Sequence, residues 1–264
     1  MRYTQKDMRE RLGISRDTLR LYERRGIIQP EVDPSNGYRY YDSWQVNLIW
    51  DCKLYQGMGF SLAEIGEILH EDDLDALRGR VRDRRDALAR ELRRLELELE
   101  ECELYLDELG TVPGGLGDFE LLQVEERLFA PAREVHDFPE GTTRAAIRFM
   151  NQETSLTRPL FWFPDISEGR YFWGFSMRAS VSAALGEDVD EHGVVRLPAC
   201  RALSTRCDAH ERGGFDRALF DDLVEEAGRR GLRPRGDLYG TLVGRAHGSD
   251  GYHRYVHAFL PVEC

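Results

Sequence analysis

The sequence predicts an α+β protein built from three successive parts. Helix caps, glycine stops and an Asn36-Gly37 turn signal crowd the first 70 residues. A leucine repeat with the spacing of a paired helix follows, and the last part alternates short apolar strands with two charged helical segments. Because caps and glycines mark helix ends and alternation marks strands, this order predicts short helices with a hairpin, one long helix and a mixed domain.

Composition limits the class of protein. The chain has 264 residues, of which 41% are hydrophobic, so two or three domains with real cores are expected. Its five cysteines are odd in number and form no Cys-X-X-Cys pair, so we expect neither a metal site nor a disulfide framework. No apolar run approaches the roughly 20 residues of a membrane helix, and the chain does not open with a signal-peptide core. We therefore expect a cytoplasmic protein with reduced thiols, no cofactor and no membrane contact.

The net charge of −12 is unevenly distributed. Met1–His70 holds ten Lys and Arg against ten Asp and Glu, so the whole deficit lies after residue 70. Nine of those ten basic residues lie before residue 40. A neutral module can bind nucleic acid when its arginines gather on one face, although a solvated charged face is the bland alternative.

Two short helices open the chain. Thr4 is placed to cap a first helix that stops at Gly13, and Ser15 to cap a second, basic helix that stops at Gly26. Two capped helices joined by a glycine turn predict a helix-turn-helix. The Asn36-Gly37 turn signal, with aromatic residues after it, predicts a wing-like hairpin.

Two more helices complete the first domain. One is expected over about residues 42–56, and the next starts at the capping box Ser61-Leu62-Ala63-Glu64 and ends at Leu69 or His70. Arginines supply charge and bidentate hydrogen bonds to phosphate or guanine, and tyrosines supply flat contact area and a hydroxyl. We therefore predict a winged helix-turn-helix DNA-binding domain over residues 1–72.

A heptad repeat follows, with apolar residues at alternating steps of four and three from Leu88 onward. A helix packed on its own domain could show such a stripe, but a charged helix of this length cannot bury it against so small a module. We therefore predict a dimerisation helix over residues 73–110. Cys102 is interpreted as a small core residue rather than a sensor thiol. The predicted seam residues are Leu88, Leu92, Leu95, Leu99, Cys102 and Leu106.

A glycine-rich linker and a separate domain complete the chain. Residues 111–117, which read Thr-Val-Pro-Gly-Gly-Leu-Gly, are expected to break the helix. Residues 118–264 then show a strand-helix-strand-strand pattern twice, which predicts an α+β domain of two repeats. The first repeat is predicted at 127–138, 143–153, 160–163 and 170–177, and the second at 194–205, 215–230, 237–243 and 252–262.

The N-terminal order of helix-turn-helix, Asn-Gly wing and the helix start Met58-Gly59-Phe60-Ser61-Leu62 resembles the MerR family of transcription regulators, over about residues 3–109. The resemblance implies a homodimer with antiparallel long helices on a pseudo-palindromic promoter, which it bends and untwists, with RNA polymerase as a further partner. It also implies that the second helix enters the major groove while the wing grips the backbone. Leu21 stands where the family often has an aromatic residue, which removes one phosphate contact. The implied DNA contacts are Arg16, Thr18, Arg20, Tyr22, Tyr38, Arg39 and Tyr40.

The third part resembles the gyrase-inhibitor-like effector-binding domain, which some MerR regulators use to sense drugs. Its length, its doubling and the segment Leu197-Pro198-Ala199-Cys200-Arg201-Ala202 carry this resemblance. Aromatic residues exceed what two small sheets need, and strand alternation assigns them to two faces, one for a core and one for a cleft. The bland alternative is that all of them are core. The residues predicted to bind a small aromatic or lipophilic ligand are Trp162, Tyr171, Trp173, Phe175, Tyr239, His257 and Phe259.

One position departs from this second family. A buried glutamate normally stands four positions before the proline of the last strand, and here His257 holds that position relative to Pro261. Aromatic walls beside carboxylates select lipophilic cations, whereas a neutral imidazole suits a neutral or anionic aromatic ligand.

Three functions follow from these patterns, and the favoured one is a ligand-responsive transcription regulator. The loss of the last-strand glutamate counts against a gyrase-inhibitor-like hydrolase of small electrophiles fused to a DNA-binding module. Because no Ser-His-Asp or metal-ligand spacing stands out, we expect no enzyme. Repression without a ligand is the third reading, and it requires the aromatic cleft to be closed core.

Overall fold

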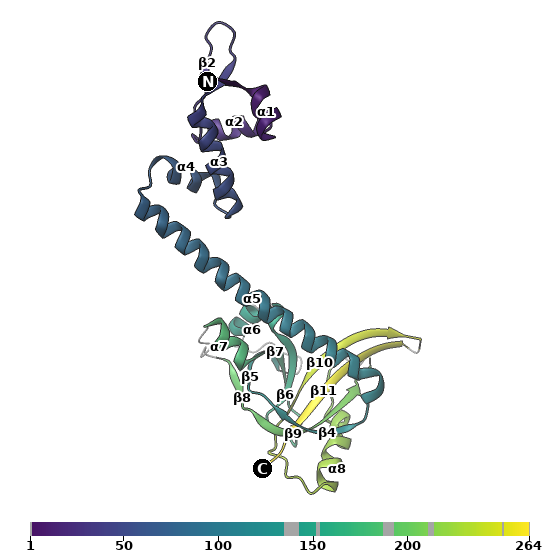
Figure 1. Ribbon diagram of the computed structural model, residues 1–264. Coiled ribbons are helices and arrows are strands. Elements are labelled where there is room, and N and C mark those ends of the chain that lie inside the picture. Colours follow the sequence, from purple (N-terminus) through teal and green to yellow (C-terminus); the bar gives the residue numbers. More distant parts are fainter. Residues whose placement is uncertain are drawn as a thin grey trace. The chain divides into compact units, whose positions relative to one another are not determined.

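Figure 1 shows the fold in a computed structural model, which describes residues 2–134, 143–151, 154–186, 193–210, 214–249 and 251–263. The chain divides into two compact units, Met1–Ala89 and Arg90–Cys264. Both contain helices, and both contain antiparallel strands, so the predicted α+β class is confirmed. Within the described ranges no helix is long and apolar enough to cross a membrane.

The N-terminal unit combines a small sheet with short helices. The sheet is antiparallel with strand order β1-β3-β2, so the wing strands β2 and β3 are joined to the start of the chain. Its elements are β1 (Tyr3–Thr4), α1 (Gln5–Leu12), α2 (Arg16–Arg24), β2 (Glu31–Val32), β3 (Arg39–Tyr41), α3 (Ser43–Gly57), α4 (Leu62–His70) and the first turns of α5 (Leu74–Gly115).

Capping side chains start the helices where the sequence predicts. The Thr4 hydroxyl accepts the backbone N–H of Asp7, whose carboxylate accepts the N–H of Thr4, and α1 ends at Gly13 with φ of 65°. The Ser15 hydroxyl accepts the N–H of Thr18 at the start of α2, and Ser61 caps α4 with a full capping box like that of α1. The predicted helix-turn-helix and fourth helix are therefore confirmed.

One apolar core holds the N-terminal unit together. It joins all four short helices to β3, and each buried aliphatic side chain contributes about 1.5–3 kcal/mol relative to exposure. The buried members are Met8, Ile14, Leu19, Tyr22, Ile27, Ile28, Tyr41, Leu48, Ile49, Cys52, Phe60, Ile65 and Ile68.

The linker prediction for residues 111–117 is wrong over most of its length, because α5 continues to Gly115. A proline inside a helix costs about 3 kcal/mol and each glycine about 1 kcal/mol. Packing of the last turn opposes this cost. Val112 is buried, Leu116 forms a bridge to Arg206, and the N–H of Gly117 donates to the Arg206 carbonyl at 2.9 Å.

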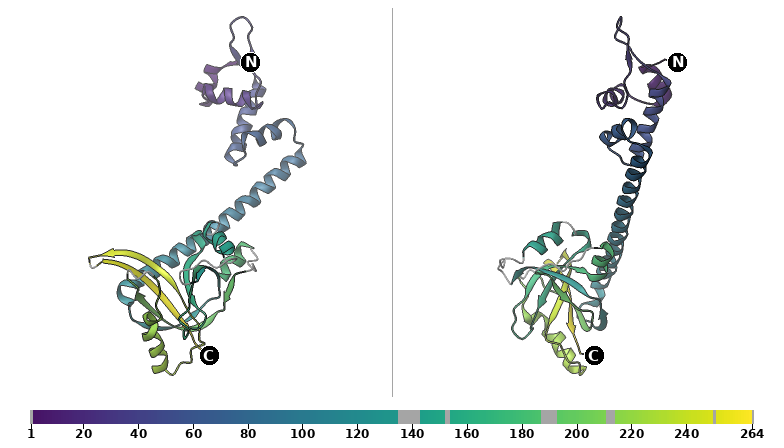
Figure 2. Two further views of the ribbon diagram at one scale, coloured as in Figure 1. Left: turned by 180° about the vertical axis from the view of Figure 1, so that it is seen from behind. Right: turned by 90° about the vertical axis from the view of Figure 1, so that its left-hand side faces the viewer.

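The C-terminal unit is an eight-stranded antiparallel sheet with helices. Strand order is β4-β9-β11-β10-β6-β7-β5-β8, and Figure 2 shows the long β10–β11 hairpin extending past its neighbours. Its elements after α5 are β4 (Phe119–Val124), β5 (Arg127–Glu134), α6 (Thr143–Asn151), η1 (Thr154–Leu156), β6 (Arg158–Phe163), β7 (Phe172–Arg178), α7 (Ala179–Leu185), β8 (Val195–Leu197), β9 (Cys200–Asp208), η2 (Arg217–Phe220), α8 (Asp221–Arg229), β10 (Leu238–Gly248) and β11 (Gly251–Pro261).

Several boundaries differ from the sequence prediction. The single strand expected over residues 194–205 is two strands, β8 on β5 and β9 between β4 and β11, and the break falls at Pro198, which has no N–H for a ladder. Strand β4 and helix α7 were not predicted. The predicted ends at residues 135–138 and 152–153 lie outside the described residues.

The two faces of this sheet pack differently. Helix α8 covers one face through Leu223 and Ala227, and α6 covers the same face further along through Phe149. The second half of α5 lies on the opposite face, because Glu108 of α5 reaches Thr241 of β10. We call this second side the α5 face.

Candidate nucleic-acid interface and ligand site

Helix α2 presents a basic surface. Arg16 and Arg20 are exposed on it, while Leu19 is fully buried and fixes the opposite side in the core. The Thr18 hydroxyl is hydrogen-bonded to Ser15 at 2.8 Å, so it belongs to the cap at the start of the helix. The first two turns of α2 can therefore meet a nucleic acid backbone with N–H groups and two arginines.

The wing beside α2 is fixed by its own turn. The Asp33 carboxylate accepts hydrogen bonds from Ser35 and Asn36, and these bonds lower the pKa of Asp33. Gly37 has a φ of 72°, which the turn requires, and the Tyr38 side chain is 64% exposed beyond it. The wing thus holds an aromatic side chain out toward solvent.

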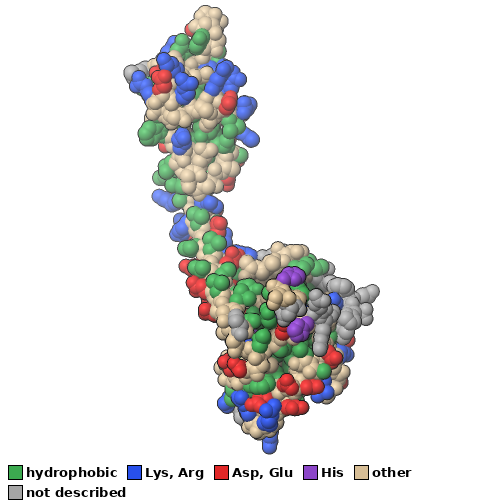
Figure 3. All heavy atoms as spheres, turned by 90° about the vertical axis from the view of Figure 1, so that its right-hand side faces the viewer, with side chains coloured by type: hydrophobic (Ala, Val, Ile, Leu, Met, Phe, Trp, Pro, Cys, Tyr) green, Lys and Arg blue, Asp and Glu red, His purple; other side chains and the backbone are tan. Residues whose placement is uncertain are grey.

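A hollow of about 520 Å³ lies between the wing and the first two helices. Its sides combine basic and polar groups from α1, α2 and the wing, which suits a polyanion. It is lined by Thr4, Gln5, Lys6, Arg16, Asn36, Gly37, Tyr38 and Arg39. On the face shown in Figure 3, basic side chains gather on the N-terminal unit, whereas the C-terminal unit carries acidic and basic side chains together.

Arg39 is held by an ion pair at the edge of this hollow. Its Nε lies 3.0 Å from Glu23 Oε2, and the hydrogen bond and charge of Glu23 raise the pKa of Arg39. Both side chains are partly exposed, so the pair is weak enough to exchange for a phosphate.

Helix α5 carries two different sides. On one side the predicted seam leucines Leu88, Leu92, Leu95, Leu99 and Leu106 are 45–67% exposed, and Cys102 is exposed with them. On the other side Leu97, Glu101 and Val112 are buried against the C-terminal unit. The seam is therefore not covered by the described residues of its own chain, and the pairing of two helices stays a prediction.

A row of aromatic side chains crosses four neighbouring strands on the α5 face. Phe172, Trp162, Tyr239 and Phe259 are direct cross-strand partners. The Trp162 and Phe172 rings are stacked at 5.8 Å between centroids, and those of Tyr239 and Phe259 lie 5.6 Å apart. We call these four residues the aromatic row.

His257 lies beside the end of this row. Its ring centroid is 4.2 Å from that of Phe259, and its Nδ1 lies 3.3 Å from Oε1 of Glu108. The Thr241 hydroxyl donates to the same carboxylate oxygen at 3.3 Å. Although burial would raise it, the hydrogen bond and charge of His257 keep the pKa of Glu108 below its ordinary value. A carboxylate from α5 thus faces the position where the last strand carries histidine.

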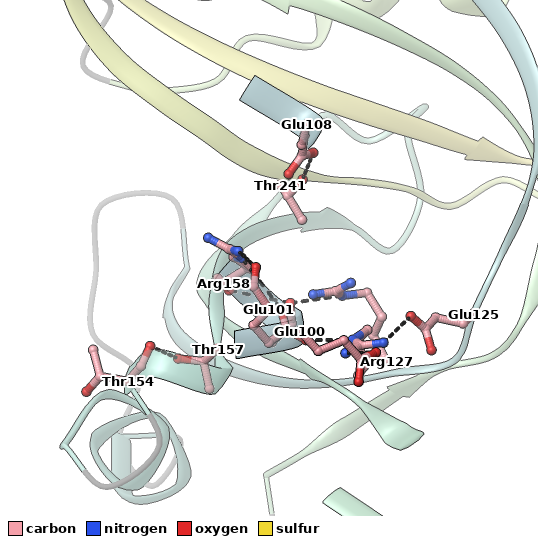
Figure 4. A network of polar contacts seen from close by, with 11 residues as sticks. Glu100, Glu101, Glu108, Glu125, Arg127, Thr154, Thr157, Arg158 and Thr241 are labelled. Carbon is pink, nitrogen blue, oxygen red and sulfur yellow. Dashed lines mark hydrogen bonds and ion pairs between the residues drawn. The ribbon is translucent and has the colours of Figure 1, made fainter. Parts of the chain in front are cut away.

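Further polar groups continue along α5 toward its middle, as Figure 4 shows for Glu100 and Glu101. Arg178 binds Glu101 at 2.6 Å and Glu100 at 2.8 Å. Although burial opposes its charge, these two hydrogen bonds raise the pKa of Arg178. The Arg158 guanidinium stacks 3.9 Å above the Tyr105 ring. Ion pairs and a cation–π contact therefore hold α5 against the sheet.

A cavity of about 140 Å³ remains beneath α5. At roughly 30 Å³ per molecule, this is room for about four waters. Its lining combines the charged groups with one member of the aromatic row. The lining residues are Glu101, Leu104, Tyr105, Glu108, Val124, Glu125, Arg127, Arg158, Arg178, Thr241 and Phe259.

Comparison with known proteins shows which family the N-terminal part resembles. The sequence model described as "MerR HTH family regulatory protein" matches residues 3–72. The HTH-type transcriptional regulator HmrR of Rhizobium leguminosarum bv. viciae is 35% identical over 101 residues, which cover 38% of this chain and 78% of HmrR. The chain belongs to the MerR family.

Other similarities of this MerR-family chain are shorter or weaker. The mercuric resistance operon regulatory protein of Bacillus cereus is 32% identical over 75 residues, which are 28% of this chain and 57% of that protein. The chain thus spans about half the length of that relative. A chain in the cryo-EM structure of the EcmrR-DNA complex in EcmrR-RPo aligns over 99% of both chains, with a TM-score of 0.38 and 15% identity. That score is too low to assign the fold of the C-terminal unit.

Tyr22 requires a correction among the predicted DNA contacts. It is 2% exposed, and its hydroxyl donates to Gln56 at 2.8 Å, so it is a core residue. Tyr40 is partly buried, with the Arg2 guanidinium 5.9 Å from its ring. Arg16, Tyr38 and Arg39 line the hollow together, and Thr18 and Arg20 lie on α2 beside it.

The predicted ligand residues also require correction, because they do not form one pocket. Tyr171 is 3% exposed and packs in the core under α8. Trp173 and Phe175 line a separate apolar hollow of about 330 Å³ with Ile147 and Met150 of α6. The remaining four lie together on the α5 face: Trp162, Tyr239, His257 and Phe259.

The contribution of α5 to this site was not predicted from the sequence. No role was predicted for Glu101, Tyr105 or Glu108 beyond their place on the charged dimerisation helix. They recur at steps of three and four, so one helix face carries them, and that spacing was the available signal.

Proposed function

We propose that this protein is a cytoplasmic, ligand-responsive transcription regulator. A homodimer paired through α5 binds a pseudo-palindromic promoter, and a small aromatic or lipophilic molecule in the C-terminal unit changes transcription by RNA polymerase. The observation that carries the proposal is the two-sided helix α5. It has an exposed leucine seam on one side, and on the other Glu101, Tyr105 and Glu108 line a cavity together with Phe259 of the aromatic row.

In this proposal α2 enters the major groove and the wing contacts the backbone. Arg16 and Arg20 contact bases or phosphates from the exposed side of α2, and Tyr38 with Arg39 contacts phosphates from the wing. Two such units in a two-fold dimer contact two half-sites. Distorting the promoter between them costs a few kcal/mol, which contacts on both half-sites offset.

DNA binding is tested with fluorescence anisotropy on fragments of the promoter upstream of the protein's own gene. Arg20→Ala should weaken binding and, if its contact is a phosphate, lower the salt slope by about one. Arg82→Ala is the matched control, since Arg82 is an exposed arginine of α5 away from α2. Equal affinity of the wild type and Arg20→Ala would refute the placement of α2.

We further propose that the C-terminal unit is a gyrase-inhibitor-like effector-binding domain of two strand-helix-strand-strand repeats. Two observations support this. β5-α6-β6-β7 and β9-α8-β10-β11 have the same element order. In both, the first strand pairs with the last, and the last with the middle one.

The ligand site we propose is the α5 face around the aromatic row. Two buried nitrogens there, Nε1 of Trp162 and Nε2 of His257, have no hydrogen-bond partner among the described residues. An unmade hydrogen bond costs about 1–3 kcal/mol, which a bound molecule with polar edges would recover. Flat rings would stack along the row, and a ligand amine would compete with His257 for Glu108.

The size of the cavity connects binding to the dimer helix. Pockets that bind drug-sized molecules have volumes of roughly 300–1,000 Å³, which is more than the 140 Å³ beneath α5. A ligand with fused rings therefore has to displace Tyr105 and Glu108, and with them this part of α5. Since α5 carries the seam, the same displacement alters the pairing of the two subunits.

Ligand binding is tested by tryptophan fluorescence of the full chain with one cationic dye, acridine orange, and one anionic dye, 8-anilinonaphthalene-1-sulfonate. Glu108→Gln should change the affinity for the cationic dye. Glu103→Gln, an exposed position on the same helix, should leave it unchanged. If both variants bind like the wild type, or if neither dye binds, the α5 face is not the ligand site.

A further inference from the structure

A cluster of one carboxylate and two imidazoles lies at the outer end of the β9–β11 ladder. Asp208 ends β9, His210 follows it, and His253 is near the start of β11. One donor atom from each lies within 4.8 Å of the others. The group shares no residue with the α2 surface, the α5 seam or the lining of the cavity beneath α5.

Backbone hydrogen bonds fix the orientation of the Asp208 carboxylate. Oδ1 of Asp208 accepts the N–H of His210 at 2.8 Å and the N–H of Arg254 at 3.1 Å. Oδ2 is left to face both rings, 2.5 Å from His253 Nδ1 and 3.3 Å from His210 Nδ1. Carboxylates that bind a metal ion are themselves held by outer hydrogen bonds, as Oδ1 of Asp208 is here.

The two rings are held differently. His253 is 8% exposed, and its ring stacks parallel to Tyr255, with 5.8 Å between centroids and 4° between planes. The His210 side chain is 62% exposed, so an ion can reach the cluster from solvent. One rigid imidazole and one accessible imidazole allow a site that is partly preformed and also open.

We propose that Asp208, His210 and His253 bind a divalent transition metal of the Zn²⁺ class. Two imidazole nitrogens and one carboxylate oxygen form the donor set that Zn²⁺ and its neighbours prefer over Ca²⁺ or Mg²⁺. With metal–ligand bonds of about 2.0–2.2 Å in a tetrahedron, donor atoms lie about 3.3 Å apart. The His210–Asp208 distance already has this value, and the His253–Asp208 pair has to open by less than about 1 Å. Water completes the shell on the exposed side.

The competing explanation is that Asp208, His210 and His253 form a hydrogen-bonded cluster that binds no metal ion. Such a cluster would show the same contacts among the three side chains. The two explanations differ in one measurable respect, which is the stoichiometry and location of metal binding, and this does not depend on DNA or on an aromatic ligand.

The test is isothermal titration of the full chain, with any affinity tag removed, using ZnCl₂, and the same titration with CoCl₂ followed by visible absorption. The wild type should bind one ion per chain. His210→Ala should weaken binding by more than about tenfold, the effect of losing even an outer-shell partner. Because His210 is exposed, this variant should keep its fold, which circular dichroism checks.

The matched control is His247→Ala, an exposed histidine on the β10–β11 hairpin that is not in the cluster. It should bind like the wild type, and Asp208→Asn should weaken binding as His210→Ala does. Absence of stoichiometric binding to the wild type, or equal losses in His210→Ala and His247→Ala, would overturn the proposal.

Discussion

Replacing Leu99 with alanine should weaken self-association of the chain and leave its fold intact. Leu99 is 61% exposed on the seam side of α5, so it contributes little to the stability of one chain. Complete burial of a leucine contributes about 1.5–3 kcal/mol relative to exposure, of which alanine retains part. The loss is then about 1 kcal/mol for each copy. A two-fold dimer buries the residue twice, which gives about 2 kcal/mol, or roughly a 30-fold higher dimer Kd.

Sedimentation equilibrium over a range of concentrations measures that Kd directly. The matched control is Leu104→Ala, which makes the same chemical change at a residue that is 45% exposed but lies off the heptad seam. Leu104→Ala should leave the Kd within about twofold of the wild type. If Leu99→Ala associates as tightly as the wild type, or if both variants lose the same affinity, pairing through this seam is refuted.

Two further predictions concern ionisable side chains. Burial raises the pKa of Tyr22 to about 12, above the value of about 10 in an unfolded chain. A tyrosine whose pKa is higher in the folded state stabilises that state fully below the unfolded pKa, and this stabilisation is lost as the pH rises through the folded pKa. The stability of the fold should therefore fall between about pH 10 and 12. Tyr22→Phe should flatten that fall in thermal melts, and an unchanged slope would contradict the burial argument. Burial also raises the pKa of Cys207 to about 12, so iodoacetamide at pH 8 should modify the exposed Cys102 first, and more slowly as the chain dimerises. Peptide mass spectrometry reads both rates, and faster modification of Cys207 would contradict the prediction.

Local rules predicted most of the N-terminal unit. Caps such as Thr4 and Ser61 act within one helical turn, so the sequence alone shows them. Tyr22 was misplaced because the resemblance supplied a contact position, while the i, i+3 spacing from buried Leu19 turns its ring inward.

The ligand side could not be predicted to the same degree. Glu108 meets His257 only because α5 crosses the sheet, and these residues are far apart in the chain. Strand alternation correctly separated Trp173 from Phe172, yet it does not tell which face a helix from another part of the chain will cover. The helical conformation of residues 111–115 has the same origin, since packing on β9 opposed a local helix-breaking signal.

The same non-local effect hides the Asp208, His210 and His253 cluster. A count of cysteines does not indicate this cluster, because it contains no cysteine. Two of its members lie at the end of one strand, and the third comes from the next hairpin. Only the β9–β11 register brings them together.

In vitro transcription from the protein's own promoter, with purified RNA polymerase and the full-length dimer, tests the central claim most directly. The reaction is run without and with a panel of aromatic compounds, while anisotropy monitors operator binding in parallel. Our account predicts that at least one compound changes transcript output in the wild type, and that Glu108→Gln alters the response while operator binding stays tight. Transcript output that no compound changes, with the operator fully bound throughout, would contradict the claim that this regulator senses a ligand.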